Sequence, residues 1–249
     1  MRNLTLLPLF LLVISCHNRT DTLTNKKTEE NPAKTSITDK TNEKPVKTER
    51  YTLEPATKAA FDQAATRQPV SFKMGPEEAR KENGVLVLKI NQKWTPLEAF
   101  RDTLLNTDDP EIREYRYLGQ NQALHQYLVA GSFYEGFETY LVDKTTGKIT
   151  PTWAEPSVSP DHKYLANVSR ATVMEGEPNG VQVWKVAGPN NSSAIAQHLE
   201  IEPQDWEPFE LQWESPESII IKMMPTEKYE QLQAEPKEED FSYLRLRVK

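Results

Sequence analysis

Cysteine is nearly absent from this chain of 249 residues: the only one is Cys16. One thiol cannot form a disulfide framework or a metal site of several cysteines. The four histidines include no pair at metal-ligand spacing and no His-Glu-x-x-His motif. The nucleophile motifs Gly-x-Ser-x-Gly and Ser-x-x-Lys at a helix start are also missing, as is a phosphate-binding loop. The sequence therefore predicts a protein without catalysis, metal or cofactor.

The chain begins with a segment typical of secreted proteins. A basic start, Met1-Arg2-Asn3, is followed by an apolar run from Leu4 to Ile14 and then by a small residue. A membrane-spanning helix needs about 20 apolar residues, and this run is shorter than that. We therefore expect residues 1–15 to be a signal peptide and not a transmembrane helix.

The signal segment ends in Val13-Ile14-Ser15-Cys16, which resembles the lipobox of bacterial lipoproteins. The resemblance implies that the sulfur of Cys16 receives a diacylglyceryl group and that Cys16 becomes the new N-terminus. It places the protein in the bacterial cell envelope, at the outer membrane facing the periplasm or the surface. Two or more acyl chains hold a protein on a membrane stably. The alternative is a cysteine that happens to close an ordinary signal peptide.

The next segment, residues 16–50, is rich in Thr, Lys, Asn, Glu and Pro and poor in aliphatic side chains. Such a stretch buries too little apolar surface to offset its ordering entropy, which predicts a disordered tether behind the lipidated cysteine. Residues 51–249 carry 21 Lys or Arg against 31 Asp or Glu. This acidic balance argues against nucleic acid as a partner and leaves the lipid anchor as the expected membrane contact.

Residues 51–249 are long enough for one folded domain that is mainly β. Over 51–110 we expect a small α/β part, with helices at 54–67, 76–82 and 96–105 and a strand at 85–90. Over 111–249, runs rich in aromatic and β-branched residues alternate with turn residues, which predicts an antiparallel meander. The expected strands are 114–118, 125–133, 137–143, 164–169, 181–186, 194–201, 209–213, 218–224 and 241–248.

Two turn sequences in this β region are similar to each other. Residues 155–166 read EPSVSPDHKYLA, and a weaker copy at 213–221 reads WESPESIII. The first resembles the hairpin of TolB-type, WD40-like β-propeller repeats, with His162 in the usual glycine position, and the resemblance extends over residues 141–224. The copies lie 56 residues apart, and a blade typically has about 40–45 residues. We therefore expect propeller-like hairpins in an open or truncated domain.

An acidic, aromatic segment between two predicted strands is the expected partner-binding site. Glu207 flanks Trp206, and Phe209 follows two residues later. An exposed tryptophan in such a segment is typical of a protein-binding hot spot. The alternative is a tryptophan ring that folds back onto the core. This segment supports the main functional expectation, a non-catalytic envelope lipoprotein that binds or scaffolds a protein partner.

A second group of residues supports a different function. Three carboxylates lie near strand ends beside three aromatic residues, a mixture that can line a sugar site. They are Glu135, Glu138 and Asp143 beside Tyr134, Phe137 and Tyr140. The alternative hypothesis is therefore an envelope protein that binds or hydrolyses carbohydrate.

Overall fold

The computed structural model describes residues 46–249 except 68–71, 76, 106–107, 171–177 and 188–193. The expected signal peptide, Cys16 and residues 17–45 of the tether lie outside the described residues. All described residues belong to one unit of the chain, residues 34–249. No helix in the described ranges is long and apolar enough to cross a membrane.

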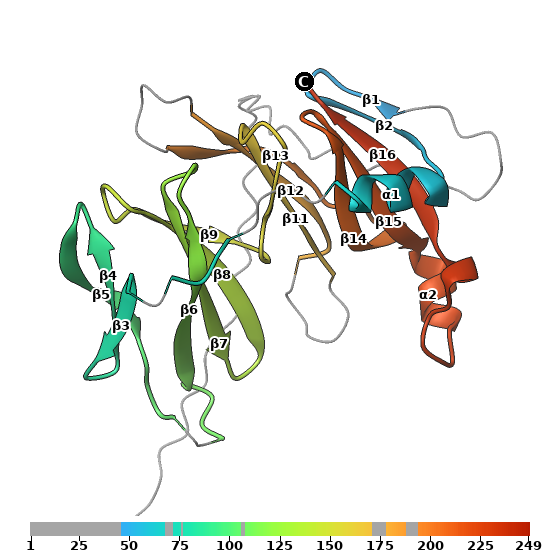
Figure 1. Ribbon diagram of the computed structural model, residues 1–249. Coiled ribbons are helices and arrows are strands. Elements are labelled where there is room, and N and C mark those ends of the chain that lie inside the picture. The colour runs from blue at the N-terminus through green and yellow to red at the C-terminus, as the bar shows by residue number, and fades with distance from the viewer. Residues whose placement is uncertain (1–45, 68–71, 76, 106–107, 171–177, 188–193) are drawn as a thin grey trace, which may run out of the picture. The chain divides into compact units, whose positions relative to one another are not determined.

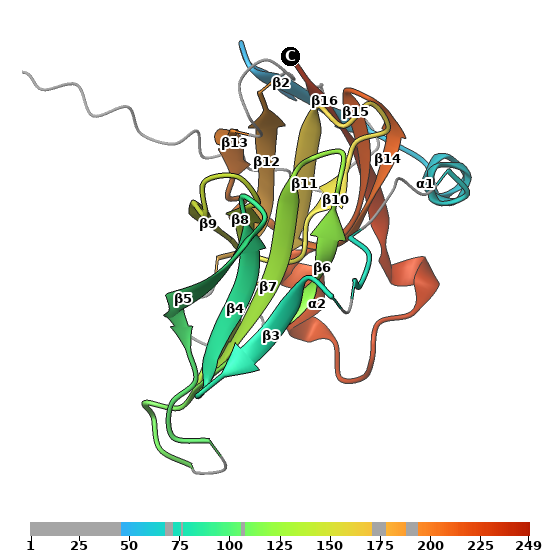
Figure 2. The ribbon, with the colours of Figure 1, turned by 60° about the vertical axis from the view of Figure 1, so that its left-hand side comes forward.

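The described chain is mainly β, as the sequence predicts, and its strands form four small antiparallel sheets (Figures 1 and 2). In three of the sheets the strands follow the chain order. The first sheet contains β3 (Ala79–Glu82), β4 (Val85–Ile90) and β5 (Lys93–Arg101), and the second contains β6 (Arg113–Asn121), β7 (Gln126–Phe133), β8 (Gly136–Asp143) and β9 (Ile149–Thr152). The third contains β10 (Ser157–Val158), β11 (Tyr164–Ser169), β12 (Gly180–Val186) and β13 (Ile195–Ile201). The fourth, the C-terminal sheet, has the order β1 (Val46–Lys47), β2 (Tyr51–Pro55), β16 (Ser242–Val248), β15 (Ser218–Pro225) and β14 (Trp206–Ser215).

Each sheet packs on the next through its own hydrophobic core. Leu88 of the β3–β5 sheet packs with Tyr127 of the β6–β9 sheet, whereas the neighbouring Leu128 packs with Leu165 of the β10–β13 sheet. Val183 of the β10–β13 sheet in turn packs with the C-terminal sheet. Because successive side chains of a strand face opposite sides, the two middle sheets are buried on both faces. This explains the nearly continuous apolar runs of β7 and β12.

The helices in the described part of the chain are short, and only one of them lies where the sequence predicts a helix. The expected helix at 54–67 is α1 (Lys58–Ala65), which begins after Thr57, whose side chain accepts a hydrogen bond from the Ala60 N–H. Phe61 of α1 packs on Tyr243 of the C-terminal sheet, with ring centroids 5.4 Å apart. Two further short helical segments near the C-terminus are α2 (Thr226–Gln231) and a 3-10 turn at Glu238–Asp240.

The helices expected at 76–82 and 96–105 are wrong, because these segments contribute β3 and β5 to a three-stranded sheet around β4. Asn83 and Gly84 both have positive φ, which forms the two-residue turn between β3 and β4. Asn-Gly between two strands is a strong hairpin signal, and it overrides the helix preference of the residues before it. Pro96 lies on β5, an edge strand of this sheet, where a missing N–H is tolerated.

The expected tether extends too far at its C-terminal end. Val46 and Lys47 form β1, which pairs with β2, and the Thr48 side chain accepts a hydrogen bond from the Tyr51 N–H in the turn between them. The folded part of the chain therefore includes residues that their composition assigns to the tether.

The expected hairpin turns are confirmed, whereas a propeller is not shown. Ser159 accepts hydrogen bonds from the N–H groups of Lys163 and Tyr164 through its side-chain oxygen, and it donates one to Asp161. His162 has a φ of +60°, in the left-handed region that favours glycine. The weaker copy at 213–221 includes the turn between β14 and β15, across which Ser215 pairs with Ser218. The described strands form an open succession of sheets.

Candidate functional site

The structure buries the tryptophan of the expected partner-binding segment. Only 1% of Trp206 is exposed, because its ring packs in the core between β12 and the C-terminal sheet. The expectation of an exposed tryptophan is therefore wrong. Trp206 begins β14, and the first three residues of this strand, Trp206, Glu207 and Pro208, are all buried. The interpretation in which the ring folds back onto the core is the one that the structure shows.

The other two residues of this segment are also packed against the protein. Glu207 is 8% exposed and accepts a hydrogen bond from the Thr226 hydroxyl, and its burial raises the pKa of the carboxyl. Phe209 is half-buried, with its ring centroid 4.8 Å from that of Phe241 and 4.0 Å from the Arg170 guanidinium carbon. These contacts show that Glu207 and Phe209 pack against other residues of the same chain. The structure therefore gives no support to a role of this segment in partner binding.

A pocket opens instead between the β6–β9 sheet and the β10–β13 sheet, with a volume of about 700 Å³. Small-molecule sites typically occupy 300–1,000 Å³. The residues that line it come from the β7–β8 turn, β8, β9 and the segment after it, β12, β13 and two loop prolines. They are Pro110, Phe133, Tyr134, Glu135, Gly136, Phe137, Glu138, Pro151, Thr152, Trp153, Pro178, Gln182, Trp184 and Gln197.

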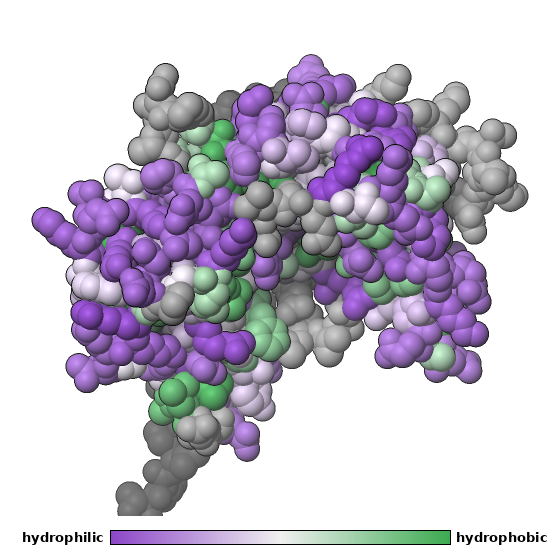
Figure 3. Space-filling model, in the orientation of Figure 1, coloured by the Kyte–Doolittle hydropathy of each residue, from purple (hydrophilic) through white to green (hydrophobic). Residues whose placement is uncertain are grey.

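Aromatic rings on the β6–β9 side of the pocket are unusually exposed. Phe137 is 69% exposed and Tyr134 is 50% exposed, although both belong to a well-formed hairpin, β7–β8. Trp153, directly after β9, is half-buried. Exposed apolar residues are costly in water when they gather at one place, and such groups mark binding sites. Figure 3 shows that one face of the molecule is mostly hydrophilic, with small separate hydrophobic patches.

A buried amide fixes the side of the pocket formed by β12. The Oε1 atom of Gln182 accepts hydrogen bonds from the Trp153 backbone N–H at 3.0 Å and from Asn167 at 3.3 Å. Its Nε2 atom donates to Glu200 at 3.1 Å, and Gln197 donates to the same Glu200 oxygen. Because Trp153 follows β9 and Gln182 lies on β12, these bonds join two sheets beside the pocket.

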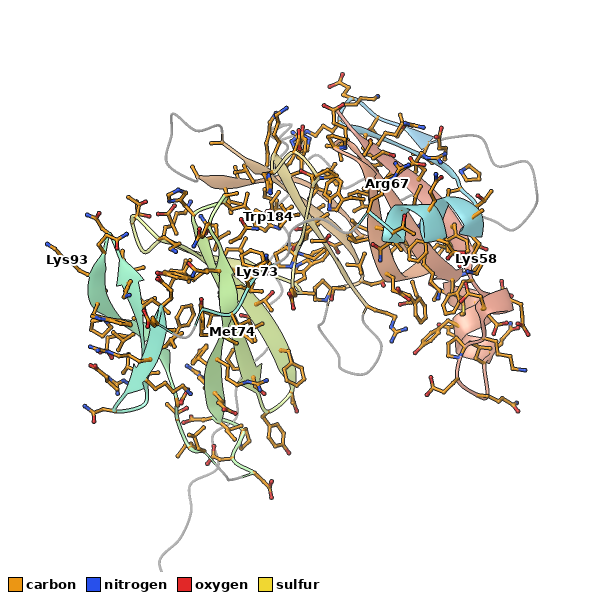
Figure 4. The ribbon with its side chains drawn as sticks, viewed as in Figure 1. Lys58, Arg67, Lys73, Met74, Lys93 and Trp184 are labelled. Atoms are coloured by element: carbon orange, nitrogen blue, oxygen red, sulfur yellow. The ribbon has the colours of Figure 1, made fainter. Side chains whose placement is uncertain are left out.

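Trp184, labelled in Figure 4, comes from β12 and lines the same pocket. The residue is 7% exposed, and its buried Nε1–H has no hydrogen-bond partner among the described residues. Leaving a buried donor unpaired costs about 1–3 kcal/mol. The indole N–H groups of Trp206 and Trp213, which lie in another core, also lack a partner among the described residues, so this donor does not by itself mark a ligand site.

The charged residues of the pocket lining are both acidic, Glu135 and Glu138. Glu138 accepts a hydrogen bond from the Tyr140 hydroxyl, whereas Glu135 is exposed. Among the described lining residues there is no histidine, serine, lysine or cysteine, and the one aliphatic hydroxyl among them, that of Thr152, is hydrogen-bonded with Thr139 at 2.6 Å. The lining as described can stack on a ligand and hydrogen-bond it, and it shows no activated nucleophile.

The pocket contains four of the six residues in the predicted carboxylate and aromatic group, namely Tyr134, Glu135, Phe137 and Glu138. The other two lie elsewhere. Asp143 is buried and accepts hydrogen bonds from the N–H groups of Thr145 and Thr146 in the β8–β9 turn. Tyr140 packs against the core shared with the β3–β5 sheet. The local cluster thus marks one wall of the pocket, and its remaining members have structural roles.

The sequence analysis missed the opposite wall. Gln182, Trp184 and Gln197 of this wall come from β12 and β13, and they meet Trp153 after β9 only because two sheets pack together. The one local signal is Gln182, an amide in the otherwise apolar run of β12. The described residues contain no group of three or more His, Cys, Asp or Glu side chains that could hold a metal ion.

Comparison with known proteins adds no family to this description. No protein-family model, no curated protein and no solved structure matches this chain.

Proposed function

We propose that this chain is a non-catalytic, lipid-anchored protein of the bacterial cell envelope whose folded domain binds a partner at the pocket between β8, β9 and β12. The observation that carries the proposal is the exposure of Phe137 and Tyr134 at the mouth of a pocket with a hydrogen-bonded polar wall. The proposed lipid anchor and the proposed envelope location both rest on the resemblance of Val13-Ile14-Ser15-Cys16 to a lipobox.

The absence of catalysis in this proposal is supported by the pocket lining. Its two carboxylates sit beside exposed aromatic rings, and Glu138 is engaged with the Tyr140 hydroxyl. A carbohydrate-hydrolysing enzyme would need one carboxylic acid and one carboxylate on opposite sides of a scissile bond. Glu135 and Glu138 instead lie on one hairpin, with Gly136 and Phe137 between them. The geometry therefore favours binding over hydrolysis.

We also propose that the four sheets are an open, propeller-like succession. Three- to five-stranded antiparallel sheets follow one another in the chain, and each packs face to face on the next. β2 completes the C-terminal sheet by pairing with β16, so strands from the two ends of the folded chain share one sheet. This arrangement supports the resemblance of the EPSVSPDHKYLA segment to propeller hairpins.

Capture experiments test the binding site directly. Detergent-solubilised full-length protein is immobilised as wild type, as Phe137→Ala and as Trp94→Ala, and a solubilised envelope fraction is passed over each. Trp94 is a matched control because it is also an exposed aromatic residue, but it lies on β5 outside the pocket lining. We expect wild type and Trp94→Ala to retain the same material and Phe137→Ala to lose it. Equal retention by Phe137→Ala contradicts the proposed site.

A further inference from the structure

We infer that the ligand of this pocket is an uncharged carbohydrate chain, an inference that rests on the proposed function and names its ligand class. The inference begins from charge. Both charged residues of the described lining, Glu135 and Glu138, are acidic, and the described lining contains no Lys or Arg. Anionic ligands such as phosphates, nucleic acids and acidic glycans would be repelled at short range. The pocket therefore disfavours an anionic ligand.

The aromatic wall fits the shape of a sugar ring. A pyranose presents a flat face of C–H groups surrounded by hydroxyls, and an exposed aromatic face covers such a surface without hydrogen-bonding demands. Phe137 and Tyr134 supply exposed rings, and Trp153 supplies a half-buried one. A purely apolar ligand would leave the polar wall of the same pocket unpaired, which disfavours lipid chains and hydrocarbons.

The polar wall fits sugar hydroxyls. Gln197 donates through Nε2 to Glu200, and this bond leaves its carbonyl oxygen as an acceptor. Trp184 of the neighbouring strand lines the same pocket, but its indole Nε1 atom is buried and does not reach the pocket surface. A sugar hydroxyl can donate a hydrogen bond, so a polyhydroxylated ligand can pair with the Gln197 carbonyl oxygen and with the Glu135 carboxylate of the lining. Gln182 is hydrogen-bonded through both its amide oxygen and its amide nitrogen and holds this wall in place.

The β9 edge of the pocket disfavours an extended peptide that joins the β6–β9 sheet. β9 is the edge strand of this sheet, and Pro151 on it has no N–H to donate. The N–H of Trp153, two residues further along the chain, is already bonded to Gln182. Addition of a peptide strand requires a row of available backbone groups, and β9 lacks it.

Calorimetric titration of the solubilised full-length protein tests the ligand class. The probes are cellotetraose, maltotetraose and N-acetylchitotetraose, with a ten-residue polyproline peptide as the comparison. We expect at least one tetrasaccharide to bind with a Kd below about 1 mM. Phe137→Ala is expected to weaken that binding at least about fivefold, and Trp94→Ala to leave it unchanged.

Three results would overturn the inference: no tetrasaccharide binds at about 10 mM, only the polyproline peptide binds, or Phe137→Ala binds sugar as wild type does. Failure of the two proposals can be told apart. If the sugars fail but envelope material is still captured through Phe137, the pocket remains the binding site and only its ligand class is wrong. If both experiments fail, the pocket itself is not the site.

Discussion

The backbone N–H of Trp153 donates a hydrogen bond to the side-chain oxygen of Gln182 over 3.0 Å, and this bond ties the end of one sheet to the middle of the next. The same oxygen accepts a hydrogen bond from Asn167 on β11. Two groups from two segments, the Trp153 N–H and the Asn167 side chain, therefore depend on one buried amide oxygen. The position of Trp153, and with it the shape of the pocket, follows from this arrangement.

Replacing Gln182 with methionine keeps the side-chain length and removes the amide. The Trp153 N–H and the Asn167 side chain then lose an acceptor, so we expect the free energy of unfolding to fall by about 1–3 kcal/mol. Urea denaturation at pH 7 measures the change. Gln197→Met is the control, because Gln197 is exposed and its replacement should change stability by less than about 0.5 kcal/mol. Equal effects of the two substitutions would show that the buried amide has no special role.

Glu207 gives a pH-dependent prediction. Burial raises the pKa of its carboxyl above the unfolded-state value of about 4.3. Because the folded-state pKa is raised, the protonated carboxyl is the form that the fold favours. Its contribution to the free energy of unfolding is complete below pH 4 and is lost as the pH rises through the folded-state pKa. Glu207→Gln keeps an acceptor for Thr226 and removes the buried charge.

We therefore expect Glu207→Gln to be more stable than wild type at pH 7 by about 1 kcal/mol, with the difference shrinking toward pH 4. Denaturation curves at the two pH values measure this. Glu210→Gln is the matched control on the same strand, since Glu210 is exposed. A variant that is less stable than wild type at pH 7 would count against a buried, destabilising carboxylate.

The ion pair between Glu214 and Arg245 predicts the opposite pH dependence. Arg245 donates two hydrogen bonds of 2.8 Å to the two carboxylate oxygens, and this guanidinium holds the pKa of Glu214 below its usual range. Because the folded-state pKa is lowered, the ionised Glu214 carboxylate stabilises the fold at pH values above the unfolded-state pKa of about 4.3. This stability is lost as the pH falls through the folded-state pKa.

We expect Glu214→Gln to lose about 1–3 kcal/mol of stability at pH 7, because both side chains of the pair are less than a third exposed. The loss should narrow below pH 4. Glu98→Gln removes an exposed pair with Arg101 and should cost less than about 0.5 kcal/mol. A loss for Glu214→Gln that is constant from pH 7 to pH 3 would mean that the charge of Glu214 is not what stabilises the fold.

Cys16 carries the prediction about the envelope. If it is lipidated, Cys16→Ala blocks both acylation and cleavage before residue 16, and the protein accumulates as unprocessed precursor. Membrane fractionation and metabolic labelling with a fatty acid measure the two effects. Wild type should carry the label and the variant should not. Label-free wild type, or unchanged processing of the variant, would show that Cys16 only closes an ordinary signal peptide.

Strands could be predicted from the sequence where burial against a core requires a run of apolar side chains. β11 matches its predicted bounds, and β7, β8, β12, β13, β15 and β16 begin and end within a residue or two of theirs. These strands face a core on at least one side, so their apolar runs are pronounced. β3 and β5 were missed because they are largely exposed and polar, and only the hairpin turn at Asn83 and Gly84 marks the pair.

One wall of the pocket could also be predicted, and the other could not. Glu135 and Phe137 are neighbours in the sequence, so their exposed hairpin is visible as a local cluster. Gln182 and Trp184 read as parts of a buried strand, and nothing local indicates that they meet Trp153. Trp206 shows the reverse error: its acidic neighbours favour an exposed segment, but packing of the C-terminal sheet on β12 buries its ring in the core.

The central claim, that the pocket binds a carbohydrate chain, is tested most directly by the five tryptophan indole N–H signals in an NMR spectrum. Trp153 and Trp184 line the pocket, whereas Trp206 and Trp213 are buried in another core and Trp94 lies on β5. On titration with the tetrasaccharide that binds, we predict that the signals of Trp153 and Trp184 shift and that the other three stay in place. Saturating ligand that leaves Trp153 and Trp184 unmoved, or that shifts Trp94 instead, would contradict the account.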